Sequence, residues 1–391
     1  MQIGLFADCW EPQVNGVVIA IKNLREAIES YGYQTTVFAP AIRPYWRSST
    51  ADYKQFAVRY PFQREFALAT PWPFRALATA RQQGIQIVHA HTEFSLGQVA
   101  FQIAKRIGVP FVFTLHTLWK YYAHYLFWGL LPYSLLARVM RRFYQLPDYF
   151  IIPTARIKDY LVTEFGVKAP ITVIPTGLDL SRFMNFKPDS KKLSGFRQVY
   201  GLKETDKIAI FVGRLGKEKS IEVLLKGLRR LTPRQPHIRL LIVGDGPERK
   251  ELARLVIRLN LKEEVRFAGY LNWQDLPLAY RACDFFVLAS RTETQGLVTV
   301  EAMASGLPVI VAEDKVNLEI VGSKENGLFF NNEQELALRL EELILSQPLY
   351  QKLSERSLQR AKFFTLEAYG QRMHEYYQHV ARDFKSRCRS I

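Results

Sequence analysis

Two series of alternating strand-like and helix-like segments constrain the fold of this chain most strongly. Short apolar runs typical of buried strands recur in the first half at 2–7, 35–39, 85–90, 110–115, 149–153 and 171–175. A second series recurs at 208–212, 239–243, 265–267, 285–288, 309–311 and 328–330. Amphipathic helical patterns fill the intervals, and helices cover both faces of a sheet where its strands run parallel. The sequence therefore predicts an α/β fold of two Rossmann-like domains that face each other across a deep cleft.

The rhythm of strands and helices breaks once, and the break sets the expected domain boundaries. The interrupting segment contains Pro188 and Gly195, which weaken both helix and strand patterns. The predicted divisions are an N-terminal domain at 1–175, an interdomain connection at 176–205, a C-terminal domain at 206–365 and a final helix at 366–391 that packs back on the first domain.

The charge of the chain narrows the class of partner. A formal net charge of +16 predicts an anionic partner, which is nucleic acid, an anionic lipid surface or an acidic small molecule. No Asp or Glu occurs in the 54 residues from 94 to 147, so the basic bias lies in the first half. Three widely spaced cysteines fit a reducing compartment and offer no metal-binding spacing. The first residues lack a signal-peptide pattern, and no apolar run is long enough to predict a membrane-spanning helix.

The segment TETQGLVTVEAMASGLPVIV, at 292–311, contains two carboxylates in a helix bounded by glycines. Glu293 precedes the expected helix, Gly296 and Leu297 open it, and Glu301 lies about two turns inside it. The free amides of a first helical turn favour an anion, while two separated carboxylates can bind different hydroxyl groups of one ligand. A nucleotide sugar offers both features. Two glutamates at this spacing are also common on solvated helices, so the spacing alone is a weak signal.

Two glycine-containing turns follow neighbouring strands of the second series. Arg214 and Lys219 lie in FVGRLGKEKS at 211–220, where two cations on one turn suit a diphosphate leaving group. Gly244 and Gly246 lie in VGDGP at 243–247. The alternatives are a solvated basic turn for the first motif and an ordinary strand–helix turn for the second. Ligands of open parallel sheets bind beyond the carboxyl ends of the strands, where both turns are expected.

The first half contributes three candidates at corresponding strand ends. Asp8 follows the first strand, and Gly16 opens the next helix, where its amide predicts an anion site. His116 ends the strand FVFTLH, and its imidazole could bind a sugar hydroxyl. For a single histidine a buried structural role is the common alternative. For His89 and His91, in IVHAHTEFSLG, we favour packing behind the site.

These motifs together resemble the family 4 retaining glycosyltransferases, and 292–308 is the most specific match. The sequence of this segment is most similar to the branch that contains the bacterial 1,2-diacylglycerol 3-α-glucosyltransferases. The resemblance as a whole covers residues 1–360. It departs from the usual pattern at Cys9-Trp10, where Thr and Tyr or Phe are common, and at Ser220, where Gly is common.

The resemblance implies a fold and a set of roles. It implies a GT-B type fold and metal-independent transfer with retention, with no cofactor beyond a nucleotide-sugar donor, which is expected to be UDP-glucose. Glu293 would hold sugar hydroxyls and Glu301 the ribose, and His116 would lie near the transferred sugar. The remaining implied roles are the diphosphate for Arg214, Lys219 and Gly16, the nucleotide base for Gly244 and Gly246, and a candidate base for Asp8.

The acceptor is predicted from residues 118–147, which are rich in aromatic and basic residues. A helix there places Leu136, Val139, Met140 and Phe143 on one face, a pattern typical of helices that lie on anionic lipid. The alternative is a helix that packs on the domain core with its arginines in water. The predicted membrane-docking residues are Trp119, Lys120, Trp128, Arg138, Arg141 and Arg142.

Three functions remain open from the sequence. The first is a peripheral glucosyltransferase at the cytoplasmic face of the cell membrane, which uses UDP-glucose and a diacylglycerol-type lipid. The second is a GDP-mannose-dependent α-mannosyltransferase acting on a lipid or an oligosaccharide. The third is a nucleic-acid-binding protein. It is disfavoured, because the chain lacks a helix-turn-helix, a zinc-ligand set and an RNA-binding strand motif.

Overall fold

The computed structural model describes residues 1–389 except 12, 14, 42–48, 60–66, 117 and 120–132. The chain divides into two compact units. Unit 1 comprises Met1–Leu178 and Leu366–Ile391, and unit 2 comprises Asp179–Thr365. Each unit is described by itself.

Unit 1 is built on an eight-stranded sheet in the order β4-β3-β2-β1-β5-β6-β7-β8. All neighbouring strands pair in parallel except β3 and β4, which are antiparallel. The strands are β1 (Gln2–Phe6), β2 (Gln34–Ala41), β3 (Tyr53–Arg59), β4 (Ala67–Ala69), β5 (Ile87–Ala90), β6 (Phe111–Thr114), β7 (Tyr149–Ile152) and β8 (Ile171–Val173).

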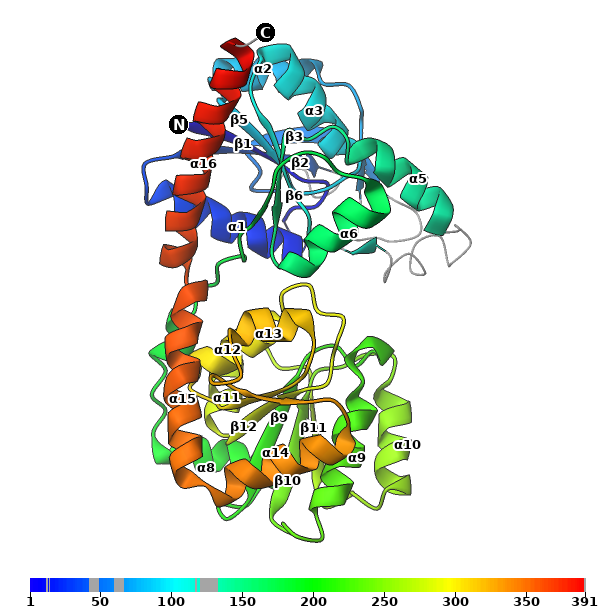
Figure 1. The fold of residues 1–391 in the computed structure, drawn as a ribbon, viewed down its shortest axis with the longest axis vertical. Helices are drawn as coiled ribbons and strands as arrows, with labels where there is room; N and C mark the ends of the chain where they lie inside the picture. Colours follow the sequence, from blue (N-terminus) through cyan, green and yellow to red (C-terminus); the bar gives the residue numbers. More distant parts are fainter. Residues whose placement is uncertain are drawn as a thin grey trace. The chain divides into compact units, whose positions relative to one another are not determined.

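Helices cover both faces of this sheet, which gives unit 1 two apolar cores. One core contains side chains of α1 and α16, which lie side by side in Figure 1. The other contains side chains of α2, α3, α5 and α6. The helices are α1 (Gly16–Glu29), α2 (Phe74–Gln82), α3 (Ser95–Ile107), α5 (Tyr133–Phe143), α6 (Ala155–Phe165) and α16 (Leu366–Arg389).

Unit 2 has a fully parallel six-stranded sheet in the order β11-β10-β9-β12-β13-β14. The order reverses between β9 and β12, as in a Rossmann fold, and ligands bind such sheets where the order reverses. The strands are β9 (Lys207–Val212), β10 (Ile238–Val243), β11 (Val265–Gly269), β12 (Phe285–Leu288), β13 (Val309–Ala312) and β14 (Leu328–Phe330).

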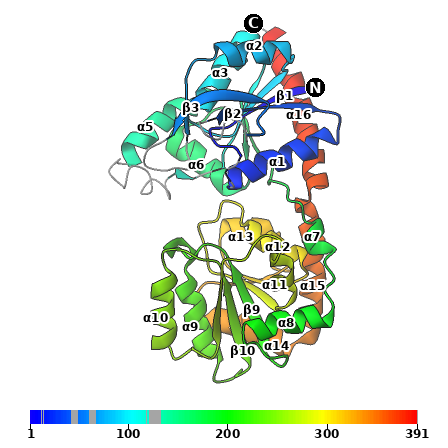
Figure 2. The ribbon, with the colours of Figure 1, turned by 180° about the vertical axis from the view of Figure 1, so that it is seen from behind.

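The helices of unit 2 alternate with its strands, and α9 lies beside α10 (Figure 2). They are α7 (Ser181–Met184), α8 (Ser190–Val199), the 3₁₀ turn η2 (Lys217–Lys219), α9 (Ile221–Leu231), α10 (Arg249–Arg258), α11 (Leu276–Arg281), α12 (Leu297–Ala304), α13 (Lys315–Val321), α14 (Glu333–Leu345), α15 (Gln347–Ala361) and the 3₁₀ turn η3 (Lys362–Phe364).

The predicted α/β class and the two Rossmann-like sheets are confirmed. Most of the segment expected as a connection, 176–205, lies in unit 2, where α8 packs against α11. The final helix α16 lies in unit 1 against α1. No described helix combines the length and the apolar character needed to cross a bilayer.

The strand patterns did not predict β3 and β4, for a physical reason. In β3 the inward position of Gln55 is polar and buried, whereas the outward Phe56 and Val58 are 57% and 62% exposed. At these three positions of β3 the usual alternation of apolar inside and polar outside is therefore reversed.

Candidate active site

Two glycine turns at the carboxyl ends of β9 and β10 pack backbone against backbone. The Gly213 amide donates to the Val243 carbonyl at 3.0 Å, and the Leu215 amide donates to the Asp245 carbonyl at 3.0 Å. Gly244 has a φ of +128°, and a Cβ atom there would collide with the Gly213 carbonyl oxygen. Only glycine permits this approach, because any side chain would separate the turns. The predicted turns that contain Gly213 and Gly244 thus form one structural feature, in which both glycines are partly exposed.

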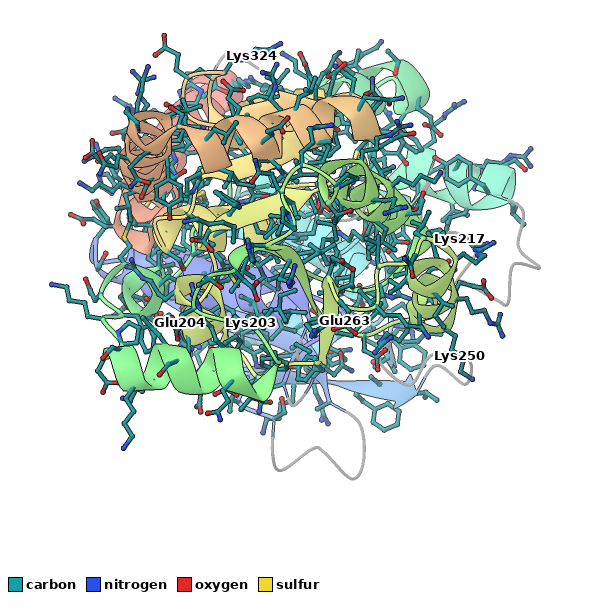
Figure 3. The ribbon with its side chains drawn as sticks, turned by 90° about the horizontal axis from the view of Figure 1, so that it is seen from below. Lys203, Glu204, Lys217, Lys250, Glu263 and Lys324 are labelled. Atoms are coloured by element: carbon teal, nitrogen blue, oxygen red, sulfur yellow. The ribbon has the colours of Figure 1, made fainter. Side chains whose placement is uncertain are left out.

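An ion pair joins the loops after β9 and β12. The Lys219 Nζ lies 2.6 Å from the Glu293 Oε1, and the two side chains are 20% and 11% exposed. Lys219 ends η2, and Ser220 follows with a left-handed φ of 49°. The neighbouring Lys217 is exposed and is labelled at the surface of unit 2 in Figure 3. The structure therefore brings together a predicted diphosphate cation and a predicted sugar-binding carboxylate.

The loop that carries Glu293 is held from two sides. Ser290 and Thr292 direct their hydroxyls toward the Glu218 carbonyl, at 3.3 and 3.4 Å. The buried Asn317 amide donates to the Ser290 carbonyl at 3.0 Å. These hydrogen bonds fix the β12 loop against η2, so the position of Glu293 is set by its surroundings.

Helix α12 begins where the sequence predicts. Gly296 precedes Leu297 with a left-handed φ of 59°, and a Cβ atom there would lie 2.9 Å from the Ile320 Cδ1. The left-handed conformation favours glycine, and the first amides of α12 have no capping side chain.

Glu301 is buried in unit 2, with 6% of its surface exposed. The Tyr280 hydroxyl donates to its Oε2 at 3.1 Å. Burial raises the pKa of the Glu301 carboxyl to about 7, against the opposing effects of the Tyr280 hydrogen bond and the Arg182 charge. A carboxyl that is shielded from water accepts the hydroxyl groups of a ligand readily, because the ligand supplies the hydrogen-bond donors that water would otherwise supply. The sequence did not indicate Tyr280 or Arg182, which lie 21 and more than 100 positions away from Glu301 in the chain.

In unit 1, Asp8 is fully occupied by hydrogen bonds at the start of α3. Its Oδ1 accepts from the Ser95 hydroxyl at 2.5 Å and from the Leu96 amide at 2.8 Å, while its Oδ2 accepts from the Thr92 hydroxyl at 2.6 Å. Burial raises the Asp8 pKa and these bonds lower it, with burial the larger effect. The contacts give Asp8 a structural task, and its role as a base stays a prediction.

The helix opened by Gly16 has an accessible first turn. The Asn15 side chain accepts from the Val18 amide at 3.0 Å, and a Cβ on Gly16 would meet nothing within 4 Å. The unusual Cys9 and Trp10 are both buried in the apolar core beneath this turn. The apolar core therefore accommodates these two residues, which depart from the pattern common in the resembled family.

Three histidines line the carboxyl edge between β5 and β6. The His91 Nδ1 lies 3.0 Å from the His116 Nε2, and the ring centres of His89 and His91 are 4.2 Å apart. Burial lowers the pKa of His116 to about 4 and that of His89 to about 3. The row is therefore uncharged at neutral pH.

A buried carboxylate near this row was missed by the sequence reasoning. The Glu93 Oε1 accepts from the Tyr144 hydroxyl at 3.0 Å, and burial raises the Glu93 pKa to about 7. Glu93 lies in the predicted motif IVHAHTEFSLG, but nothing in the motif distinguishes a buried carboxylate from a solvated one.

The predicted docking helix uses its apolar stripe for packing. Leu136, Met140 and Phe143 are buried in the unit 1 core, whereas Val139 is 59% exposed. The outward face combines two apolar side chains with basic ones, namely Leu135, Val139, Arg138 and Arg142.

The other predicted docking residues have different surroundings. Arg141 is also exposed and donates to the Glu164 carbonyl at 2.8 Å. Trp119 is buried with its ring edge-on to Phe94. Lys120 and Trp128 lie outside the described residues.

Comparison with known proteins decides the family. Residues 14–182 match the model for Glycosyltransferase Family 4, and residues 195–360 match that for Glycosyl transferases group 1. An alpha-monoglucosyldiacylglycerol synthase of Streptococcus pneumoniae is 30% identical over 388 residues, which cover 96% of this chain and 85% of the relative. The chain belongs to glycosyltransferase family 4. The predicted family and its enzymatic class, a hexosyltransferase, are thereby confirmed.

Further relatives agree with this placement. A protein of the same name from Acholeplasma laidlawii is 29% identical, with 94% of each chain covered. HepE from Anabaena, solved in complex with UDP, superimposes with a TM-score of 0.76 at 21% identity, covering 97% of this chain and all of that one. The fold is therefore the predicted GT-B type. Among the described residues, no group of three or more His, Cys, Asp or Glu is arranged to hold a metal ion.

Proposed function

We propose that this glycosyltransferase moves glucose from UDP-glucose to 1,2-diacylglycerol with retention, giving an α-glucosyl lipid at the cytoplasmic face of the membrane. The observation that carries the proposal is the similarity over nearly the whole chain to two alpha-monoglucosyldiacylglycerol synthases. The geometry of unit 2 supports the donor part, because the ion pair of Lys219 and Glu293 and the uncapped start of α12 both follow strand ends of one sheet.

Unit 2 would act on the leaving diphosphate. Breaking the bond between the sugar C1 and the diphosphate oxygen leaves negative charge on the diphosphate, which Lys219 and Arg214 would stabilise together with the first amides of α12. One carboxylate oxygen of Glu293, Oε1, forms the ion pair with Lys219. The other oxygen would accept a sugar hydroxyl, and Glu301 would accept the ribose hydroxyls.

Retention follows from attack on the face that the diphosphate leaves. A bond forms between C1 and the acceptor oxygen, and the acceptor proton passes to the leaving phosphate oxygen. No protein base is needed for this proton balance, which agrees with the full hydrogen bonding of Asp8. No metal ion is needed either, since protein cations offset the charge.

Membrane docking would use the outward face of α5. Arg138 and Arg142 lie there beside the exposed Leu135 and Val139. Basic residues near an anionic bilayer contribute about 1 kcal/mol each, and apolar neighbours can enter the interface. A lipid acceptor requires such contact, because diacylglycerol stays in the bilayer.

A donor screen tests the proposal. The protein is incubated with radiolabelled UDP-glucose, UDP-galactose or GDP-mannose and with vesicles that contain diacylglycerol and phosphatidylglycerol. Label is expected in the lipid phase with UDP-glucose only. Label from GDP-mannose alone would support the mannosyltransferase, and label from none of the three donors would overturn the lipid acceptor.

A further inference from the structure

His116 is held by another histidine from the neighbouring strand. Strands β5 and β6 pair in parallel with Ala90 opposite Phe113, so His91 and His116 leave the same edge of the sheet. The His91 Nδ1 lies 3.0 Å from the His116 Nε2, and the two rings are only 20° from parallel. This geometry is a direct ring-to-ring hydrogen bond, in which one neutral imidazole donates and the other accepts.

Within the described part of the chain, His91 makes no other hydrogen bond through its side chain. It is 3% exposed, and its Nε2 is buried without a hydrogen-bond partner among the described residues. An unpaired polar atom costs free energy in a buried place. The single hydrogen bond to His116 is thus what a polar side chain contributes at this position that an apolar one would not.

The ring of His91 packs against His89, which a residue of the last helix holds in place. His89 lies 4.2 Å from His91 between ring centres, and it is fixed by Tyr377 of α16 and by Thr114. The Tyr377 hydroxyl and the His89 Nδ1 are 2.7 Å apart. Burial raises the pKa of the Tyr377 hydroxyl, which therefore stays protonated and able to share a hydrogen bond with Nδ1. The His89 Nε2 lies 2.7 Å from the Thr114 hydroxyl, so both nitrogens of the ring have a hydrogen-bond partner.

We propose that His91 is a positioning residue for His116, which it holds by Nε2 so that Nδ1 is the ring nitrogen presented to the ligand. The proposal rests on the proposed function together with the role that the family resemblance implies for His116, beside the transferred sugar. A neutral Nδ1 either accepts from a sugar hydroxyl or donates to it, and its orientation decides which hydroxyl is reached. Tyr377 and His89 contribute indirectly by supporting the ring of His91.

Replacing His116 by a residue with an amide side chain tests which ring nitrogen contacts the ligand. The asparagine amide lies close to the position of a histidine Nδ1, whereas the glutamine amide lies close to that of Nε2. His116→Asn is therefore expected to retain about tenfold more kcat/KM than His116→Gln, the value of one hydrogen bond in the transition state. The reverse ranking would overturn the proposal.

Variants of His91 test the positioning itself. His91→Leu is expected to lower kcat about tenfold with little change in the KM for UDP-glucose, and His91→Asn, which keeps a polar group near Nδ1, is expected to recover most of the loss. His379, exposed on α16, supplies the control His379→Leu with unchanged kinetics. Equal kcat for His91→Leu and wild type would contradict the proposal.

A spectroscopic readout separates this proposal from the proposed function. In protein labelled with ¹⁵N-histidine, the ring nitrogens of His116 are expected to show one fixed tautomer in wild type and an average of tautomers in His91→Leu. The measurement needs no donor or acceptor, so it decides the positioning role even if wild type transfers no glucose to lipid. Unchanged His116 shifts in His91→Leu would overturn it. Where that variant does not fold, the comparison at position 116 decides.

Discussion

The carboxyl edges of the two sheets have similar topology, but one carries charged side chains and the other uncharged ones. In unit 2, the edge carries the partly exposed ion pair of Lys219 and Glu293. In unit 1, the corresponding edge carries a row of uncharged imidazoles, of which His89 and His91 are buried, and both carboxylate oxygens of Asp8 accept hydrogen bonds within the fold. A charged edge suits a diphosphate, whereas a neutral edge suits uncharged hydroxyl groups. The difference indicates that the side chains at the strand ends, rather than the shared topology, divide the work between the units.

The largest effect is expected when the charged edge of unit 2 loses its lysine. Lys219→Ala removes one cation from the leaving diphosphate and leaves Glu293 without its ion-pair partner, so kcat should fall about 10²–10³-fold. Lys217→Ala, from the same turn but exposed, is the matched control and should transfer at the wild-type rate. Steady-state kinetics with UDP-glucose checks both variants. Wild-type turnover in Lys219→Ala would remove the diphosphate role.

A second prediction concerns the buried carboxylate of the same unit. Glu301→Gln keeps the size of the side chain but loses the charge that would accept the ribose hydroxyls. Hydrogen bonds to a charged group contribute about 1.5–3 kcal/mol, so the Kd for UDP should rise at least about tenfold. Calorimetric titration measures this change, and an unchanged Kd would contradict the assignment.

The same variant has a predicted effect on stability that depends on pH. The Glu301 pKa is raised to about 7 from the ordinary 4.5, so the folded state favours the protonated form. The favourable contribution is present below about pH 4.5 and is lost as the pH rises through 7, because the charge must then be buried. Glu301→Gln should therefore raise Tm at pH 8 and change it little at pH 5. An equal shift at both values would argue against a buried, weakly acidic carboxyl.

The third prediction tests whether unit 1 contacts the membrane through α5. Arg138→Ser combined with Arg142→Ser should weaken sedimentation with phosphatidylglycerol vesicles, by about fivefold for each arginine at low salt. Arg141→Ser should have a smaller effect, since that side chain already donates to the Glu164 carbonyl. Unchanged partitioning of the double variant would end the docking proposal.

The smallest expected effect concerns metal ions. If the cations of unit 2 offset the charge of the diphosphate, chelation with EDTA should leave the rate of glucose transfer unchanged. Loss of activity that is restored by added Mg²⁺ would show that the charged edge is insufficient by itself.

The sequence predicted those features that depend on neighbouring residues. Central parallel strands are buried on both faces, so they read as continuous apolar runs, and the glycine turns and Glu293 lie in local motifs. Strand β3, which lies next to the edge strand β4, was missed because Gln55 faces inward and Phe56 outward.

Partnerships between distant residues could not be predicted from the sequence. Tyr377 meets His89 across 288 positions, and Tyr280 meets Glu301 across 21. No local pattern indicates such pairs, which arise only when the fold brings α16 and α11 to their sheets. The apolar stripe of α5 was ambiguous for a related reason, since core packing and lipid contact require the same spacing.

The most direct test of the central claim is the anomeric configuration of the lipid product. The protein is given UDP-glucose with diacylglycerol in anionic vesicles, and the glycolipid is analysed by proton NMR. The account predicts a monoglucosyl diacylglycerol whose anomeric proton shows the small coupling of an α-glucoside. A β-glucoside, or glucose that stays in the aqueous phase, would contradict it.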